Sequence, residues 1–194
     1  GRQGVTRNFM IVGVGGQGSL LASRLLGRVL MNAGLDVKVS EVHGMSQRGG
    51  SVVTYVRAGD KVYSPIIDEG EAEFIISFEL LEAARNLKYL APEGRVITNT
   101  QQVAPMPVIT GEAAYPENLA VKIAATGASI DAFDALEIAE RAGSSKAVNI
   151  VLMGRLSRYL DIPEEEWLHA LEETVPPRFL ELNKQAFMLG RDGH

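Results

Sequence analysis

The stretch FMIVGVGGQG, residues 9–18, decides the fold of this chain. A short apolar run ends there in a cluster of glycines, and apolar residues then recur with a helical period over residues 19–33. Gly34 is suited to end this helix, and residues 36–42 have the composition of a second strand. The order strand, glycine turn, helix, strand predicts a βαβ unit that brings two parallel strands together.

The segment after the second strand departs from a plain doubly wound fold. Residues 51–57 favour a strand, and Gly59 with Asp60 favours a tight turn, so we expect a β-hairpin that continues through residues 61–64. We further expect strands over 74–77, 95–98 and 121–125. We expect helices over 80–90, 134–142, 163–175 and 178–189, and one that Ser144 or Ser145 caps. The predicted fold class is α/β, a three-layer α/β/α arrangement with a mixed, mostly parallel sheet.

Size and charge narrow the functional classes. The chain has 194 residues, enough for one domain, which we place at residues 8–194 behind a flexible leader or cloning remnant at residues 1–7. The formal net charge is −5 and no run of Lys and Arg makes a basic stripe, so nucleic acid is not an expected partner. The apolar runs are too short to span a bilayer, which excludes a membrane role by this route.

The chain contains no cysteine. This excludes disulfides, cysteine nucleophiles and iron–sulfur clusters held by this chain's thiolates. The three histidines show no metal-binding spacing, so no metal site is expected. If the protein serves a redox enzyme, another chain carries the electrons.

Gly13, Gly15 and Gly18 match the GxGxxG pattern between a strand and a helix, where bare backbone can approach a phosphate. A dinucleotide such as NAD or FAD is one interpretation, with Glu41, 23 residues after Gly18, holding a ribose hydroxyl. The polar loop that follows, in place of a helix, argues against it. The other interpretation is that the glycines only allow a tight turn and close packing of helix on strand.

A second cluster, EVHGMSQRGGS at residues 41–51, gathers polar groups between two apolar runs. Arg48 offers a forked donor for a carboxylate or phosphate, and Gly49 and Gly50 let the backbone come close. His43 can transfer a proton near neutrality, or it can be a hydrogen-bonding residue that merely orders the loop. Arg48 can likewise be the ion-pair partner of Glu41 or of another acidic residue.

Together, GVGGQG and EVHGMSQRGGSV resemble the gamma unit of the 2-oxoacid:ferredoxin oxidoreductases, and within that family the small (beta) subunit of the indolepyruvate branch. The likeness extends from Asn8 over nearly the whole chain and includes VYSP at residues 62–65 and EAE at residues 71–73. The pyruvate and 2-oxoglutarate branches have a related Arg-Gly pair in a different setting. A gamma subunit of one of those branches is the alternative within the family.

The resemblance implies a subunit that is inactive alone and works in an enzyme converting an aryl 2-oxoacid, coenzyme A and oxidised ferredoxin to acyl-CoA, carbon dioxide and reduced ferredoxin. It places thiamine diphosphate and the iron–sulfur clusters in a large partner subunit, in an anaerobic cytoplasm. Coenzyme A would lie in a cavity shared by both chains, with His43 and Arg48 as the expected catalytic residues. A homodimer of the isolated chain is a further hypothesis. The residues expected to face coenzyme A are Gly13, Gly15, Gly16, Gln17, Gly18, Ser46, Gln47, Arg48, Gly49 and Gly50.

Overall fold

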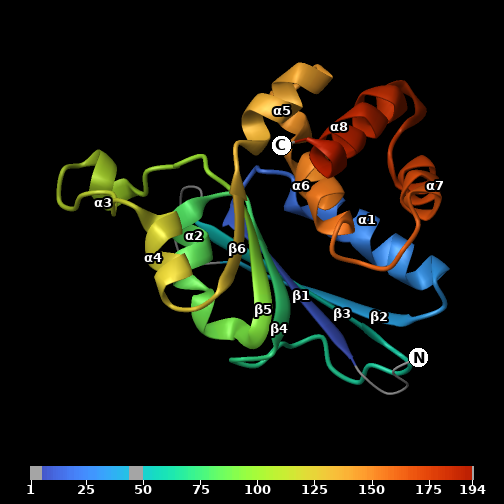
Figure 1. The fold of residues 1–194 in the computed structure, drawn as a ribbon, viewed down its shortest axis with the longest axis horizontal. Helices are drawn as coiled ribbons and strands as arrows, with labels where there is room; N and C mark the ends of the chain where they lie inside the picture. The colour runs from blue at the N-terminus through green and yellow to red at the C-terminus, as the bar shows by residue number, and fades with distance from the viewer. Residues whose placement is uncertain (1–5, 44–49, 194) are drawn as a thin grey trace.

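The computed structural model describes residues 6–43 and 50–193. Its described part contains one six-stranded sheet in the order β2-β3-β1-β4-β5-β6 (Figure 1). Strands β1, β4, β5 and β6 are parallel, whereas β3 runs antiparallel to both of its neighbours. The strands are β1 (Arg7–Val14), β2 (Asp36–His43), β3 (Ser51–Gly59), β4 (Ala72–Ser77), β5 (Leu90–Asn99) and β6 (Ser129–Phe133).

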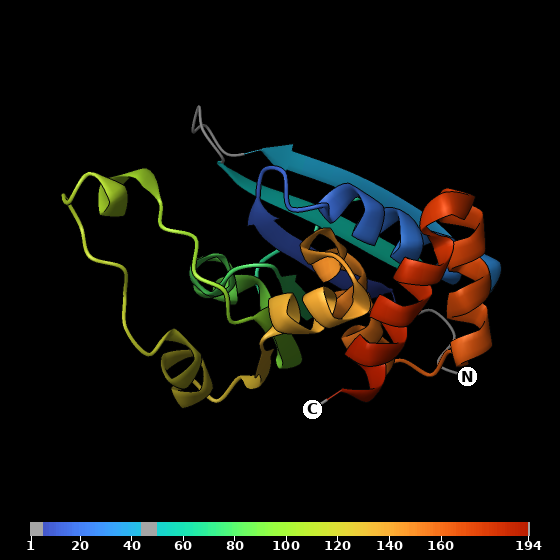
Figure 2. The same ribbon diagram turned by 90° about the horizontal axis from the view of Figure 1, so that it is seen from above.

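Helices cover both faces of this sheet, which confirms the three-layer prediction. Helices α1, α5, α6, α7 and α8 pack on one face, and α2 and α4 on the other, while α3 lies apart from both layers (Figures 1 and 2). The helices are α1 (Ser19–Asn32), α2 (Leu80–Arg85), α3 (Met106–Ile109), α4 (Leu119–Ala125), α5 (Ala135–Ala142), α6 (Val148–Ser157), α7 (Glu164–Thr174) and α8 (Leu180–Asp192). Short 3₁₀ turns are η1 (Leu87–Tyr89), η2 (Ser145–Ala147) and η3 (Pro177–Phe179).

The predicted βαβ unit exists, but its two strands are not neighbours. Strand β3 lies between β1 and β2 and pairs with β1 along its whole length, from Arg7 opposite Ala58 to Val14 opposite Ser51. The predicted hairpin partner of β3 is therefore wrong: β3 pairs with β2, and residues 61–64 lie outside the sheet. Alternate residues of β3 are buried, as expected for a strand with one face against the core. Hydrogen bonding to β1 on one side and to β2 on the other holds β3 inside the sheet.

Two further sequence predictions are wrong. Residues 121–125 belong to helix α4, because Leu119 and Ile123, four residues apart, are its buried positions. The strand that follows is β6, whose mixed sequence SIDAF gives only a weak strand signal. The helix predicted over residues 80–90 is shorter, because β5 already begins at Leu90.

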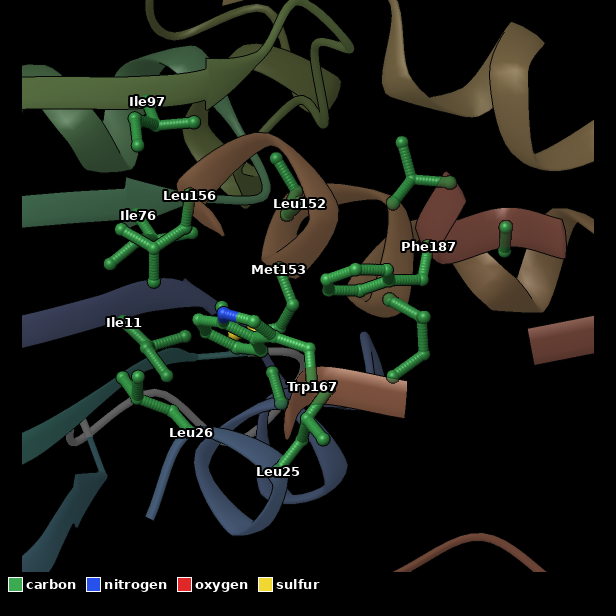
Figure 3. Close-up of a cluster of buried hydrophobic side chains, with 14 of the residues drawn as sticks. Ile11, Leu25, Leu26, Ile76, Ile97, Leu152, Met153, Leu156, Trp167 and Phe187 are labelled. Carbon is green, nitrogen blue, oxygen red and sulfur yellow. The ribbon is translucent and has the colours of Figure 1, made fainter. Parts of the chain in front are cut away.

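The larger core lies between the sheet and the five-helix layer. Trp167 is fully buried between α1, α6 and α8, with its ring centroid 5.5 Å from that of Phe187 (Figure 3). All ten residues of α6 are buried, so this helix is central and not amphipathic.

The predicted leader, residues 1–7, overlaps the first strand. Residues 1–5 lie outside the described part, whereas Arg7 belongs to β1 and its side chain pairs with Glu73.

Candidate functional site

The candidate site lies at the edge of the sheet where β1, β4, β5 and β6 reach their carboxyl ends. The glycine turn, residues 15–18, follows β1 at this edge, and the end of β2 at His43 and the start of β3 at Ser51 lie there as well. The N–H of Gly15 donates to the carbonyl of Gly50 at 3.2 Å, which ties the two motifs together. In open α/β sheets this edge, at the point where the crossovers change direction, is the usual ligand site.

Two glycines of the GxGxxG pattern, Gly13 and Gly18, have a local steric reason. A Cβ at Gly13 would lie 2.6 Å from Oε1 of Gln17, and one at Gly18 would lie 2.6 Å from Nδ2 of Asn149. Gln17 accepts the N–H of Val14 at 2.7 Å, so its acceptor closes the turn. These contacts favour the interpretation of the glycines as a tight, closely packed turn.

Gly16 differs from its neighbours. It has φ +85°, and a Cβ built there would meet nothing within 4 Å. It is also exposed, as Gly15 is. The left-handed backbone accounts for the glycine, and the open space leaves the main chain at Gly16 accessible to a ligand.

Two hollows flank the glycine turn. The first, here called the α6 pocket, has a volume of about 500 Å³. Its lining residues are Gly16, Gln17, Gly18, Phe78, Gln101, Leu136, Ser145, Lys146 and Val148. The second, here called the α3 pocket, has a volume of about 590 Å³. It lies between Gly15, Gly50 and Arg85 on one side and the segment from Val103 to Ile109 on the other.

A buried carboxylate holds the outer wall of the α3 pocket. Glu79 is only 1% exposed, and its Oε1 accepts the N–H of Val103 at 3.3 Å and the hydroxyl of Tyr115. Its Oε2 caps α2 by accepting the N–H of Glu82 at 3.0 Å. Burial, and then the bond to Glu79, raises the pKa of the Tyr115 phenol. Glu79 thus fastens both ends of the segment that carries α3.

A second buried carboxylate, Glu82, joins the polar loop to α2. It accepts the hydroxyl of Ser51 at 2.8 Å and pairs with Arg85 at 2.8 Å. Sequence reasoning missed Glu79, Glu82 and Arg85. The signal that could have found them is position, because Phe78 and Glu79 directly follow a buried parallel strand at the ligand-binding edge.

The structure places His43 at the end of β2 with its side chain 67% exposed. Its Nε2 lies 2.5 Å from Oε1 of Glu41, two residues earlier on the same face of the strand. Glu41 is therefore engaged by His43. Four other predicted site residues, Ser46, Gln47, Arg48 and Gly49, lie outside the described part of the chain.

Within residues 6–43 and 50–193, no group of three or more His, Cys, Asp or Glu side chains is arranged to hold a metal ion. The same residues contain no helix of the length and apolar character needed to cross a membrane.

The sequence and the fold both have known relatives. The model of the family described as pyruvate ferredoxin/flavodoxin oxidoreductase matches residues 8–193. The chain belongs to this family. Indolepyruvate oxidoreductase subunit IorB of Thermococcus kodakarensis is 44% identical over 188 residues, which cover 94% of this chain and 93% of the relative.

Two solved structures of the oxidoreductase family share the fold. The gamma subunit of a keto/oxoacid ferredoxin oxidoreductase from Geobacter sulfurreducens aligns with a TM-score of 0.71 at 21% identity, over 95% of this chain and 96% of that one. The 2-oxoglutarate:ferredoxin oxidoreductase of Magnetococcus marinus aligns with a TM-score of 0.70 at 19% identity, over 96% of this chain but only 30% of that one. In the second enzyme the fold is thus one part of a longer polypeptide.

Membership of the oxidoreductase family makes this chain a subunit of a 2-oxoacid:ferredoxin oxidoreductase. The stand-alone NAD or FAD module is not favoured. The geometry agrees, because β3 stands where a dinucleotide fold would place a parallel strand, and Glu41 is engaged by His43.

Proposed function

We propose that this chain is the small subunit of an indolepyruvate-type oxidoreductase. With a larger partner it oxidatively decarboxylates an aryl 2-oxoacid, transfers the acyl group to coenzyme A and reduces ferredoxin. The observation that carries the proposal is the 44% identity to an indolepyruvate oxidoreductase subunit over 93% of that subunit's length. The absence of cysteine assigns cluster ligation by thiolates to the partner.

The shared cavity is proposed to form where the glycine turn meets the polar loop. The α3 pocket is lined by both motifs, through Gly15, Gly50 and Ser51, and the α6 pocket is lined by Gly16, Gln17 and Gly18 of the glycine turn. The hydrogen bond between Gly15 and Gly50 joins the two motifs. The related Magnetococcus marinus enzyme is described with 2-oxoglutarate, coenzyme A and succinyl-CoA bound. This supports a family site large enough for oxoacid and coenzyme A together.

Thiamine diphosphate, when bound in the partner, supplies the electron sink for decarboxylation. This chain contributes placement and charge. Arg48 is proposed to pair with a phosphate of coenzyme A or with the substrate carboxylate, and Gln17, whose Oε1 closes the turn, retains its amide N–H groups for donation. The close contact with Glu41 orients the His43 ring, which is proposed to transfer a proton or to position the thiol.

The test is reconstitution. The chain is co-expressed with the large subunit of an indolepyruvate oxidoreductase from the same organism, and reduction of a viologen dye is measured with indolepyruvate and coenzyme A. We expect turnover by the complex and none by either chain alone, with indolepyruvate preferred over pyruvate and 2-oxoglutarate. Preference for pyruvate or 2-oxoglutarate would reassign the branch, and tight NAD or FAD binding by the isolated chain would overturn the proposal.

One variant tests the polar loop within the same assay. Arg48→Ala should reduce turnover at limiting coenzyme A or oxoacid by at least tenfold, because a charge-assisted bond to a ligand contributes about 1.5–3 kcal/mol. The matched control is Arg24→Ala, an exposed arginine of α1. Equal turnover by both variants would remove Arg48 from the site. Light scattering on the isolated chain tests the homodimer hypothesis.

A further inference from the structure

Lys146 is brought to the glycine turn from the far end of the chain. It lines the α6 pocket together with Gly16, Gln17 and Gly18, although 128 residues separate Lys146 from Gly18. The hydroxyl of Ser144 accepts the N–H of Lys146 at 3.1 Å and starts the turn η2. Lys146 therefore belongs to an ordered turn whose backbone position is fixed by hydrogen bonding.

A hydrogen bond between residues distant in sequence holds the start of α6 against the glycine turn. The Nδ2 of Asn149 donates to the carbonyl of Gly18 at 3.2 Å, and Asn149 is only 5% exposed. Its Oδ1 accepts the N–H of Ile150 at 2.8 Å. Lys146 lies three residues before Asn149, so its backbone keeps a constant distance from the turn.

The charge of Lys146 has no carboxylate partner among the described residues, where no Asp or Glu oxygen lies within 4 Å of its Nζ. Among the described residues Lys38, Lys88 and Lys184 each pair with a carboxylate, at 3.7, 3.6 and 3.1 Å, whereas Lys61, Lys122 and the exposed Lys146 do not. Of these three unpaired lysines, Lys146 is the one that lines the α6 pocket. No acidic residue lines the α6 pocket either. In a chain with net charge −5, a cation left uncompensated beside a glycine turn favours an anionic ligand.

We propose that the α6 pocket binds a phosphate or pyrophosphate group of the phosphorylated thiol cofactor, and that Lys146 supplies the opposing charge. This inference rests on the proposed function, in which coenzyme A enters the shared cavity. The volume of about 500 Å³ suits part of a cofactor of that size. A lysine ammonium is a point charge that suits phosphate, and the open backbone at Gly16 allows close approach.

The pocket also has an apolar side. Phe78, Leu136 and Val148 contribute apolar side chains to its lining. A phosphate held by Lys146 would leave the uncharged part of the cofactor against these side chains. The arrangement of one cation, open backbone and apolar wall fits a nucleotide-bearing cofactor better than a small oxoacid, whose carboxylate needs no pocket of this volume.

The test is steady-state kinetics on the reconstituted complex. Lys146→Ala should raise the KM for coenzyme A at least tenfold, leave kcat at saturating coenzyme A within twofold, and leave the KM for indolepyruvate unchanged. Lys146→Arg should recover most of the loss. The control is Lys122→Ala, an exposed lysine of α4 in the opposite layer. Dephospho-CoA identifies the phosphate: the effect of Lys146→Ala disappears if Lys146 meets the ribose phosphate and persists if it meets the pyrophosphate.

An unchanged KM for coenzyme A in Lys146→Ala, or a raised KM for the oxoacid alone, would overturn the inference. If the wild-type complex shows no turnover that depends on coenzyme A, the proposed function fails, and a second measurement still tests the pocket. In that measurement inorganic pyrophosphate is titrated into the full-length chain, followed by the amide signals of Gly16 and Gly18. We expect binding by wild type that weakens at least tenfold in Lys146→Ala, and no binding by wild type would refute the anion site itself.

Substituting glycines by alanine distinguishes an effect on ligand binding from an effect of backbone strain on stability. Gly16 and Gly34 have nearly the same φ, +85° and +90°, and neither has an atom within 4 Å of a built Cβ. Gly16→Ala and Gly34→Ala should therefore lose similar stability. Only Gly16→Ala should also raise the KM for coenzyme A, and an equal KM for both variants would contradict a ligand at the glycine turn.

Discussion

Replacing Gly154 with alanine should force helices α6 and α8 apart. A Cβ at Gly154 would lie 2.1 Å from the carbonyl oxygen of Phe187 and 3.0 Å from the amide nitrogen of Arg191. From the other side, a Cβ at Gly190 would lie 2.2 Å from the carbonyl oxygen of Val151. These neighbours are backbone atoms, so no side-chain rotation can relieve the clash.

The expected cost follows from the size of this overlap. A carbon and an oxygen in contact need more than 3 Å, so the helices must separate by roughly 1 Å. Overpacking of a close-packed core usually costs about 1–3 kcal/mol and occasionally more. Alanine returns about 1 kcal/mol through its helix propensity. Because α6 is buried on all sides, little of the strain can relax, so we expect a gross cost at or just above the upper end of this range, about 3–4 kcal/mol, and a net loss of about 2–3 kcal/mol for Gly154→Ala.

Gly27 in helix α1 is the matched control. It is also a buried helical glycine, but a Cβ there would meet only the side chains of Val37 and Val39, at 3.8 and 4.0 Å. These are ordinary contacts. Gly27→Ala should therefore be neutral or stabilising by up to about 1 kcal/mol.

The assay is urea unfolding followed by the fluorescence of Trp167, the only tryptophan of the chain, whose ring packs against Phe187 of α8. The slope of the unfolding free energy against urea should stay constant while the midpoint moves down for Gly154→Ala and stays or rises for Gly27→Ala. A loss below about 1 kcal/mol for Gly154→Ala, or an equal loss for both variants, would refute the close crossing of α6 and α8.

Three other outcomes are expected. Asp131→Ala leaves the buried guanidinium of Arg155, now 3.2 Å from Asp131, without its carboxylate, and should lower the unfolding free energy by about 3 kcal/mol in denaturant titrations. Tyr115→Phe removes one of the bonds to the buried carboxylate of Glu79, so hydrogen exchange should quicken over residues 103–115 but not in the sheet, and uniform protection would contradict the role of Glu79. Burial, and then a hydrogen bond to Glu79 and to Asp131 respectively, raises the pKa of Tyr115 and of Tyr159. The folded state therefore keeps both phenolic protons after the unfolded chain starts to lose them near pH 10. Because the folded state then binds more protons, its stability falls as the pH rises above about 10. An absorbance titration should show both phenols of the folded protein ionising above the usual pH of about 10, and their titration near pH 10 in the folded state would contradict the raised pKa.

The sequence by itself determined the first strand, the glycine turn and α1, because apolar periodicity and glycine clusters are local signals. It also determined the class of fold and, through two motifs, the family. The lack of cysteine excludes iron–sulfur clusters held by this chain's thiolates, while the larger partner subunit stays a prediction. The prediction that the two motifs face a common site is consistent with their bond through Gly15 and Gly50. The roles of His43 and Arg48 stay predictions.

Only the tertiary structure decided which strands are neighbours. Strand β3 enters between β1 and β2 because backbone pairing along its whole length outweighs the local turn signal at Gly59 and Asp60. Residues 121–125 became a helix and β6 a strand for a similar reason, since short segments carry too little local information to outweigh packing.

The composition of the α6 pocket could not be predicted from the sequence either. Lys146 and Gly18 are 128 residues apart, and no local pattern links them. They meet because α6 is held against the glycine turn by Asn149 and packs against α8 through Gly154. Contacts between distant residues form only when the core closes, so the glycine turn was visible in the sequence but the cation beside it was not.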